Sequence, residues 1–296
     1  MELAGAVALI TGAAGFVGSR IARRLLREGV RVRGLDRRLL ESADIEGFVG
    51  DVTDRAAVEA AASGVELVVH CAAVISGTPE DTIRVNVEGT RAVLDAAIRS
   101  GCQRFVHMST AAVYAFDDRP VVDETTPFRH EGAPFHVSRV TAEQVVWAAS
   151  GARPSVTVFR PHYILGAHPT ATWSTLLAQR MARGEYVLPG NGSGSWPYVH
   201  VDNLAAAVVT AVRADHSIGQ AYNIVDGHTT AREYAERFRE WLGLASIPTR
   251  PELRPWHGRL SGEKAVRELR YAPSVSYEEA MSETERYLAE CGIVKR

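Results

Sequence analysis

A short apolar run at residues 7–10 leads directly into three glycines spaced three residues apart. Gly12 can make the tight turn, Gly15 leaves room for a pyrophosphate beside the backbone, and Gly18 lets the following helix pack closely on the strand. A helix over residues 16–27 would direct its first backbone amides at the phosphates. Glycines also serve ordinary turns, because they adopt positive φ without strain. The order of strand, turn, amphipathic helix and a later acidic residue therefore indicates dinucleotide binding.

Residues that could select the cofactor follow the second expected strand, at 31–35. Asp36 stands where a carboxylate accepts the hydroxyls of the adenosine ribose, which favours NAD(H). Arg37 and Arg38 come next, and they could bind the 2′-phosphate of NADP(H) through charge-assisted hydrogen bonds. Arginines in such a position are also often simply solvated. The sequence predicts NADP(H) as the cofactor, with NAD(H) tolerated.

The bulk composition excludes several classes of partner. The chain has 296 residues, a formal net charge of −2 and a pI near 6.6, so it offers no broad basic surface to nucleic acid. No apolar run is as long as a membrane span, and no secretory leader pattern is present. Cys71, Cys102 and Cys291 show no metal-like spacing, and neither do the histidines. We expect a cytoplasmic monomer or homodimer with a small-molecule substrate and no metal, nucleic-acid or membrane partner.

Apolar strand patterns alternate with helical patterns through the first half of the chain. Such alternation is typical of an α/β fold with a doubly wound parallel sheet, the Rossmann arrangement, joined by right-handed crossovers. The expected strands lie at 6–11, 31–35, 47–50, 66–72, 104–109 and 155–160, and the expected helices at 16–28, 54–63, 79–99 and 136–150.

The pattern changes after residue 161, because the later segments are richer in Pro, Gly and Trp. We expect a small C-terminal substrate-binding lobe that covers the carboxyl ends of the strands, where ligands bind in such sheets. Residues 1–165 and about 199–228 are assigned to the dinucleotide-binding domain, and about 166–198 and 229–296 to the lobe. Further helices are expected near 202–213, 230–242 and 277–290.

Several motifs occur together in an order that resembles the extended short-chain dehydrogenase/reductase family over nearly the whole chain. They are the loop 11–18, Gly50-Asp51-Val52, His70-Cys71-Ala72-Ala73, Asn86 with Gly89-Thr90, the strand end 109–114, Arg160-Pro161 and the landmark 198–202. The resemblance implies a hydride-transfer enzyme with a nicotinamide cofactor. The cofactor contacts expected are Gly12, Ala14, Gly15, Phe16, Val17, Gly18, Asp36, Arg37, Arg38, Asp51, Val52, Cys71, Ala72, Ala73, Arg139 and Pro161.

The chain departs from that family at the catalytic Tyr-x-x-x-Lys motif. In the family the tyrosine exchanges a proton with the substrate oxygen, and the lysine lowers the pKa of that tyrosine and holds the nicotinamide ribose. Here Phe135 and Arg139 occupy those positions. Phe135 has no proton to give, and Arg139 keeps a cation that can bond the ribose hydroxyls but stays protonated near neutral pH. A missing general acid costs roughly 10²–10⁴ in rate, so this chain is either a cofactor-binding relic or a reductase with another proton source.

Thr110 matches the hydroxyl residue that polarises the substrate carbonyl in the family. An equally ordinary role for a threonine at a strand end is to bond a neighbouring backbone group. Ala111 and Ala112 stand where sugar 4,6-dehydratases carry an acidic pair, so that elimination chemistry is not expected. The predicted catalytic residues are therefore Thr110 and Arg139.

Two further departures concern the substrate. Members that act on sugar nucleotides place an asparagine after Arg-Pro and an arginine before the later landmark, whereas this chain carries aromatic residues at both places. Flat rings favour offset stacking, although a single tryptophan is more often part of a core. The substrate contacts expected are Ser76, Tyr114, Phe135, His162, Tyr163, Trp173 and Trp196.

These features predict an NAD(P)H-dependent ketoreductase that reduces a carbonyl of an aromatic polyketide or similar polycyclic secondary metabolite, as in antibiotic biosynthesis. Its proton would come from water, from a nearby tyrosine or histidine such as His136 or His162, or from an acidic phenol of the substrate. Two alternatives stay open. One is a catalytically silent NAD(P)-sensing regulatory protein, and the other is a non-redox cyclase or lyase that keeps the nucleotide as a scaffold.

Overall fold

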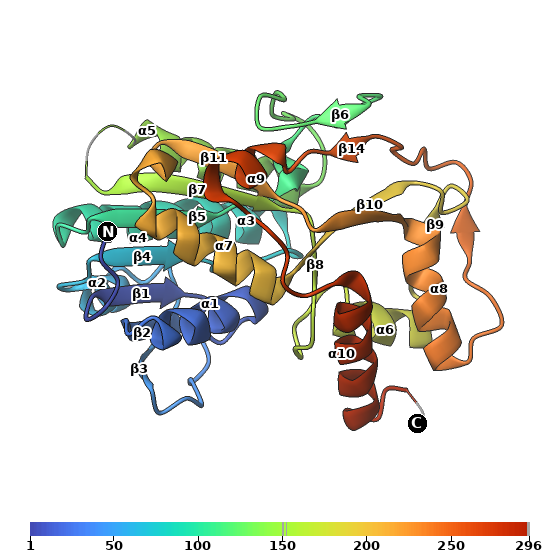
Figure 1. Cartoon of the computed structure of the whole chain (residues 1–296), viewed down its shortest axis with the longest axis horizontal. Helices are drawn as coiled ribbons and strands as arrows, with labels where there is room; N and C mark the ends of the chain where they lie inside the picture. The colour runs from blue at the N-terminus through green and yellow to red at the C-terminus, as the bar shows by residue number, and fades with distance from the viewer. Residues whose placement is uncertain (150, 152, 295–296) are drawn as a thin grey trace.

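The computed structural model describes residues 1–149, 151 and 153–294. Figure 1 shows a wide sheet with helices on both faces, and a smaller group of helices and strands beyond the carboxyl ends of its strands. The predicted α/β class is confirmed.

The main sheet has the strand order β11-β7-β5-β4-β1-β2-β3, and every neighbouring pair is parallel. The order reverses at β1, which makes the sheet doubly wound and leaves a ligand crevice at the carboxyl ends of β1 and β4. All six expected strands are present, and a seventh, β11, was not predicted because its five residues include the polar Gln220 and Asn223. The strands are β1 (Val7–Thr11), β2 (Arg31–Asp36), β3 (Ile45–Val49), β4 (Leu67–His70), β5 (Arg104–Met108), β7 (Ser155–Pro161) and β11 (Gln220–Ile224).

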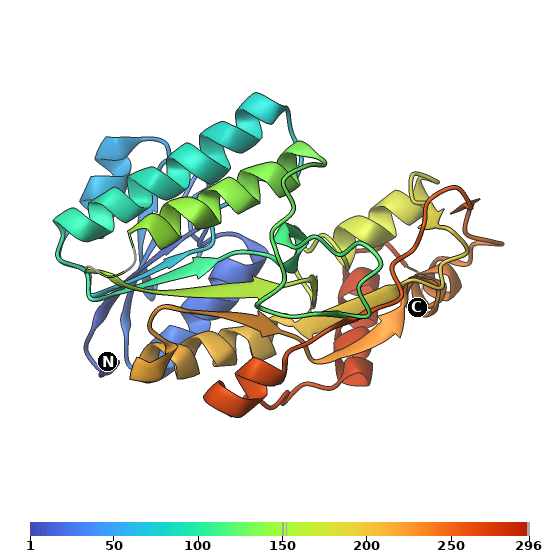
Figure 2. The same cartoon turned by 90° about the horizontal axis from the view of Figure 1, so that it is seen from above.

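Helices cover both faces of this sheet, as the view in Figure 2 makes plain. Apolar residues of α1 (Phe16–Arg27), α7 (Val201–Arg213) and α9 (Glu263–Leu269) pack on one face. Those of α2 (Arg55–Ala62), α4 (Gly89–Arg99) and α5 (Pro134–Ala148) pack on the other. The apolar sides of the helices thus bury both faces of the strands, which is what a fully parallel sheet requires.

Two of the expected helices differ in detail from the structure. The segment predicted as one helix over 79–99 consists of α3 (Pro79–Thr82), a π-helical stretch η1 (Ile83–Glu88) and α4. Helix α5 begins two residues earlier than predicted, with Pro134 in its first turn, where a missing N–H costs nothing. The last predicted residue of that helix, 150, lies outside the described residues.

The smaller group of elements has a sheet and a core of its own. Strand β10 (Ser195–His200) lies between β8 (Tyr163–Leu165), to which it is parallel, and β12 (Gly227–Thr230), to which it is antiparallel. Helices α6 (Thr175–Ala182), α8 (Ala231–Leu242) and α10 (Tyr277–Glu290) enclose a buried cluster that includes Leu177, Trp196, Tyr234 and Met281. The proposed boundaries at 198/199 and 228/229 fall inside β10 and β12, both of which belong to this small sheet.

Several short elements complete the structure. Strand β6 (Val121–Val122) pairs with β14 (Arg259–Leu260), and β9 (Leu188–Pro189) pairs with β13 (Thr249–Arg250). The 3₁₀ turns are η2 (Ala111–Val113) and η3 (Asp215–Ser217). The β6–β14 pair attaches the late segment of the chain to the loop that follows β5.

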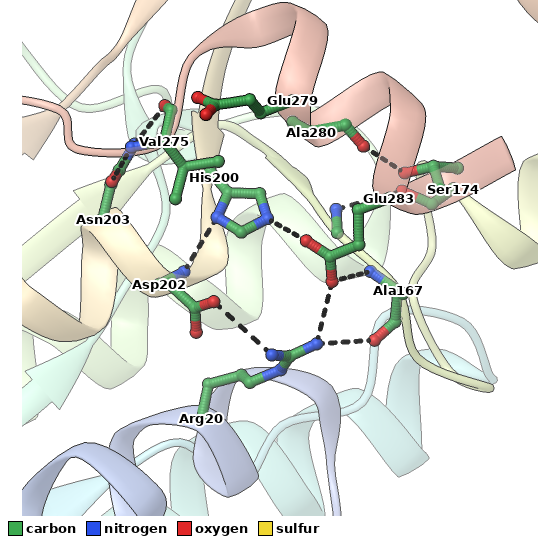
Figure 3. Close-up of polar contacts among 12 residues, drawn as sticks. Arg20, Ala167, Ser174, His200, Asp202, Asn203, Val275, Glu279, Ala280 and Glu283 are labelled. Carbon is green, nitrogen blue, oxygen red and sulfur yellow. Dashed lines mark hydrogen bonds and ion pairs between the residues drawn. The ribbon is translucent and has the colours of Figure 1, made fainter. Parts of the chain in front are cut away.

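A charged network joins the first helix of the sheet to the last helix of the lobe (Figure 3). Arg20 of α1 donates to the Ala167 carbonyl at 3.0 Å and to Glu283 of α10 at 3.1 Å, and it pairs with Asp202 at 3.4 Å. The other oxygen of Glu283 lies 3.0 Å from His200 Nε2. The hydrogen bond with His200 and the charges of His200 and Arg20 outweigh the effect of burial and lower the pKa of Glu283 to about 2.

We predict that the Glu283 network stabilises the fold in a pH-dependent way. Because the folded pKa of Glu283 is below its ordinary value of 4.5, the stabilisation is complete above that pH and is lost as the pH falls toward 2. Glu283→Gln should lower the free energy of unfolding by about 1–3 kcal/mol at pH 7. Urea titrations of wild type and variant should show this difference shrinking below pH 4.5. Glu285→Gln, an exposed position on the same helix, is the control, and a pH-independent difference would contradict the prediction.

Candidate dinucleotide and substrate site

The glycine loop after β1 has the backbone that close approach requires. Gly12 has φ +69°, and a Cβ there would lie 2.9 Å from the Ala72 amide nitrogen. A Cβ on Gly18 would lie 2.2 Å from the Gly12 carbonyl oxygen, so only glycine lets α1 pack this close to the loop. Helix α1 has no side-chain cap at Gly15 and no acidic residue in its first turn. The first amides of α1, including those of Phe16 and Val17, are therefore free to bind the phosphates of a dinucleotide.

Asp36, at the end of β2, is fixed beside this loop. Its Oδ2 accepts the Ala14 amide at 3.0 Å, and its Oδ1 accepts the Arg38 amide at 3.1 Å. The Arg38 guanidinium reaches back to the Ala14 carbonyl and lies 3.7 Å from Asp36, and both Arg37 and Arg38 are exposed. A carboxylate for ribose hydroxyls and a cation for a 2′-phosphate thus stand side by side.

Two more strand ends complete the cofactor side of the crevice. After β3, burial opposes ionisation of Asp51, but hydrogen bonds from the Thr53 amide and hydroxyl hold its pKa below the usual range. Next to it Val52 is buried. After β4, burial raises the pKa of the Cys71 thiol to about 12, so the group is neutral, and Ala72 and Ala73 continue this segment.

A buried chain of hydrogen bonds holds the end of β4. His70 Nδ1 lies 2.7 Å from the Thr11 hydroxyl, which also accepts the Ala72 amide, and Nε2 lies 2.9 Å from the Thr90 hydroxyl. The Thr90 hydroxyl donates to the Asn86 carbonyl at 2.6 Å, so we assign the ring proton to Nε2. Burial lowers the pKa of His70 to about 3, so the ring stays neutral.

The start of α5 carries the two residues that replace the usual catalytic pair. Phe135 is half-buried in the first turn, and its carbonyl accepts the Ser138 hydroxyl, which Asn86 holds in turn at 3.0 Å. Arg139, one turn further on, donates through Nη2 to the Met108 carbonyl. Its Nε and Nη1 have no partner among the described residues and are not sealed from solvent. Burial lowers the pKa of Arg139 to about 10, which leaves it charged at neutral pH.

Thr110 caps the 3₁₀ turn η2, because its Oγ1 accepts the Ala112 amide at 3.2 Å. Thr110 therefore does bond a neighbouring backbone group, which was the ordinary structural role considered for it. The hydroxyl proton of Thr110 remains available to a ligand oxygen. The acidic pair of the sugar 4,6-dehydratases is absent here, since the turn begins with Ala111 and Ala112.

Beneath the catalytic strand ends lies a buried ion pair that the sequence did not single out. Glu143 on α5 is fully buried, and it pairs with Arg160 on β7, which is 4 % exposed. Glu143 also accepts the Ser109 hydroxyl and the Trp147 indole N–H at 2.9 Å. Arg160 donates further to the Tyr114 hydroxyl at 2.6 Å. Every charge of the cluster has several partners, as burial demands.

Tyr114 does not lie where a substrate contact was expected. Its side chain is fully buried, and its hydroxyl accepts from Arg160 and donates to Asn223 Oδ1 at 2.8 Å. Asn223 on β11 donates to the Ser261 carbonyl at 3.0 Å. Tyr114 therefore connects β7, β11 and the segment before α9. Because its side chain is fully buried, it does not offer the substrate contact that was expected.

Trp196 is also not a free wall of the site. It is 4 % exposed and stacks between Tyr163, at 3.6 Å between ring centroids, and Tyr234, at 5.2 Å. Trp196 therefore belongs to the core of the lobe, as the alternative interpretation of a single tryptophan held. Trp173 packs edge-on against Tyr163 at 4.8 Å and is half-buried.

Four half-buried aromatic side chains contact one another in series, and we define the aromatic wall as Phe116, His162, Tyr163 and Trp256. His162 lies 4.0 Å from Tyr163 and edge-on to Phe116 at 5.5 Å, while Phe116 meets Trp256 edge-on at 4.7 Å. All four side chains are half-buried. Burial lowers the pKa of His162 to about 3, so this ring is a neutral hydrogen-bonding group. Ser76 lies exposed in the segment after β4.

Sequence reasoning missed Phe116, Trp256, Glu143 and Asn223. A signal existed only for Glu143: an arginine in a buried strand must have an anionic partner, and Glu143 lies one turn after Arg139 on the same helix. Phe116 and Trp256 are 140 positions apart in the sequence, and only the β6–β14 pairing brings their segments together.

Comparisons with known protein families, sequences and structures agree with this geometry. The family model for the NAD dependent epimerase/dehydratase family matches residues 8–225. A 4-hydroxy-2-methyl-3-oxo-4-farnesyl-3,4-dihydroquinoline-1-oxide ketoreductase of Stigmatella aurantiaca is 32% identical over 229 residues, covering 74% of this chain and 67% of its own. A 3 beta-hydroxysteroid dehydrogenase/Delta 5-->4-isomerase of Mycobacterium tuberculosis is 33% identical over 239 residues, covering 74% and 64%. An epimerase from Methanothermobacter thermautotrophicus superposes with a TM-score of 0.87 at 23% identity, covering 97% and 93%.

The chain belongs to the NAD dependent epimerase/dehydratase family. It is an NAD(P)-dependent oxidoreductase, and the glycine loop, the uncapped α1 and Asp36 fit the dinucleotide. Over residues 1–149, 151 and 153–294, no helix has the length and apolar character needed to cross a membrane. The same residues contain no cluster of side chains that could hold a metal ion.

We predict that Glu143 is essential to stability because it neutralises Arg160. Removing one member of a buried ion pair leaves the other uncompensated, so Glu143→Gln should lower the free energy of unfolding by about 3–5 kcal/mol in urea titrations. Replacing both residues by apolar ones, as Glu143→Leu with Arg160→Met, should recover part of this loss. Glu59→Gln breaks the exposed pair with Arg99 and should cost less than about 1 kcal/mol. Similar losses at both sites would contradict the prediction.

Proposed function

We propose that the protein is a ketoreductase that reduces a carbonyl of an aromatic polyketide or a similar polycyclic secondary metabolite. The observation that carries this proposal is the aromatic wall of Phe116, His162, Tyr163 and Trp256, because flat rings bind polycyclic ligands by stacking. The names of two relatives support it, since one reduces a dihydroquinoline ketone and the other acts on hydroxysteroids. A substrate with a diphosphate is less suited, because the segment before β10 has no arginine for it.

The bound nicotinamide would supply a hydride to the carbonyl carbon, and the chain's residues would position and polarise the substrate. Thr110 would donate a hydrogen bond from its hydroxyl to the carbonyl oxygen, and Arg139 would bond the nicotinamide ribose through Nε and Nη1. Phe135 would line the pocket without exchanging a proton. Pro161, at the end of β7, would border the nicotinamide side.

The proton that neutralises the new alkoxide needs another source. Tyr114 is unsuited, because burial raises its pKa and its hydroxyl is already engaged. We propose an acidic phenol of the substrate, held beside the carbonyl, where proximity replaces the missing tyrosine. In lacking Tyr-x-x-x-Lys the chain resembles the simocyclinone angucyclinone ketoreductase, an atypical member of the extended family.

We predict that a hydroxyaryl ketone is reduced with NADPH far faster than its O-methyl ether. Methylation removes the phenolic proton but keeps most of the flat surface, so kcat should fall about 10²–10⁴-fold while binding changes little. Stopped-flow or steady-state loss of NADPH absorbance gives kcat and KM for both compounds. A nonaromatic ketone of similar size serves as the control for stacking.

The other outcomes discriminate among the alternatives. If the ether is reduced as fast as the phenol, the donor is water or a protein group, and His136, His162 and Tyr163 become the residues to mutate. If no aromatic ketone drives NADPH oxidation, the ketoreductase proposal fails in favour of the silent regulatory protein. Conversion of substrate without net change in the nucleotide would favour the cyclase or lyase.

We also propose NADP(H) as the preferred cofactor, with NAD(H) tolerated. Arg38 lies beside Asp36, and Arg37 is exposed next to it, so both can reach a phosphate on the ribose that Asp36 faces. Replacing both arginines by alanine should weaken NADPH at least ten-fold more than NADH, because a hydrogen bond to a charged group contributes roughly 1.5–3 kcal/mol. Calorimetric titration measures both affinities, with Arg286→Ala on α10 as the control. Equal losses for the two cofactors would exclude the phosphate contact.

A further inference from the structure

A turn of the lobe lies directly over the start of α1. This turn is residues 166–170, and the Arg20 network holds it from both sides (Figure 3). Arg20 donates to the Ala167 carbonyl at 3.0 Å, and Glu283 accepts the Ala167 amide at 3.3 Å. A Cβ on Gly166 would lie 3.1 Å from the ring of Phe16, so the turn is in close contact with the glycine loop's helix. The position of this turn over α1 is therefore fixed by charged contacts and by packing.

His168 is the ionisable side chain of this turn. Its ring stacks on Phe16 with 5.7 Å between centroids and 25° between planes. Phe16 is the first residue of α1 and buries its ring against Ala171 and Val201. The imidazole of His168 therefore lies against the first residue of α1, the helix whose uncapped amides are free to bind dinucleotide phosphates.

The tautomer of His168 is set by its own turn. The Thr170 amide donates to Nδ1 at 3.2 Å, and the Thr170 hydroxyl lies 2.9 Å from the same atom. Because Nδ1 accepts a hydrogen bond, the proton of the neutral ring lies on Nε2. No partner occupies Nε2 within the described part of the chain, and the atom is not sealed from solvent. His168 thus offers one free, oriented N–H.

The surroundings of His168 are positively charged. Burial, and after it the guanidinium groups of Arg38, Arg20 and Arg23 in that order, lower its pKa to about 4. The ring is therefore a neutral donor at physiological pH. The same positive potential attracts an anion to the space that Nε2 faces.

We propose that His168 is a cofactor-binding residue contributed by the lobe, and that its Nε2–H donates to a phosphate oxygen of the bound dinucleotide. The phosphate is either the pyrophosphate at α1 or the 2′-phosphate beside Arg38. In both cases the lobe and the Rossmann sheet bind one ligand together, and the Arg20–Glu283 network positions the donor. The proposal depends on dinucleotide binding by this family and is independent of the identity of the ketone.

The test measures binding of NADH and NADPH to the full chain by calorimetry, without substrate or turnover. His168→Phe keeps a ring to stack on Phe16 but removes the donor, and it should weaken binding about ten-fold or more. His168→Gln retains an N–H donor and should recover part of the affinity. His216→Phe, at an exposed histidine on η3, is the matched control. Thermal melting of each variant verifies that it is folded.

The pattern of losses identifies the phosphate. A loss for NADH and NADPH alike supports the pyrophosphate, and a loss for NADPH alone supports the 2′-phosphate. Unchanged affinity of folded His168→Phe for both nucleotides would overturn the proposal, and so would a wild-type chain that binds neither. A failure to reduce any ketone bears only on the proposed function, because no ketone enters this experiment.

Discussion

The buried pair of Glu143 and Arg160 is the constraint on which the catalytic half of the site depends. Two opposite charges placed in a nearly water-free interior tolerate few geometries, because each must meet the other and satisfy its remaining hydrogen bonds. Here the pair ties α5 to β7, and Ser109 extends the tie to the end of β5. Arg139 lies one turn before Glu143 on the same helix, so the pair also sets where Arg139 meets the Met108 carbonyl.

A second set of charges, centred on Arg20 and Glu283, likewise ties elements together, here beside the glycine loop. It is more accessible to water than the first, and it joins α1 to α10 and to the turn after β8. Together the two networks fix the elements on both sides of the crevice, which are α5, β5 and β7 on one side and α1 with the turn after β8 on the other. A cofactor that spans the crevice would thus meet groups whose positions were fixed before it bound, which lowers the entropic cost of binding.

The chemistry follows from what these networks hold. The usual proton donor is absent, the nearby Tyr114 is buried within a hydrogen-bonded network, and the histidines His70 and His162 are neutral because burial disfavours their charge. What remains is the hydroxyl of Thr110, the cation of Arg139 and the aromatic wall. The proposed substrate, which is flat and brings its own acidic group, would suit such a site, because positioning and polarisation are all that the chain would then need to supply.

The sequence by itself determined the fold class, six of the seven strands and the dinucleotide loop, because these rest on local periodicity and on glycines with no alternative backbone. It also determined the loss of the catalytic tyrosine, which is a matter of residue identity at Phe135. Only the tertiary structure decided that Tyr114 and Trp196 are buried, that Glu143 neutralises Arg160, and that His168 lies on Phe16. These contacts join residues that are 17 to 152 positions apart, and no local pattern encodes which distant side chains meet when strands and helices pack.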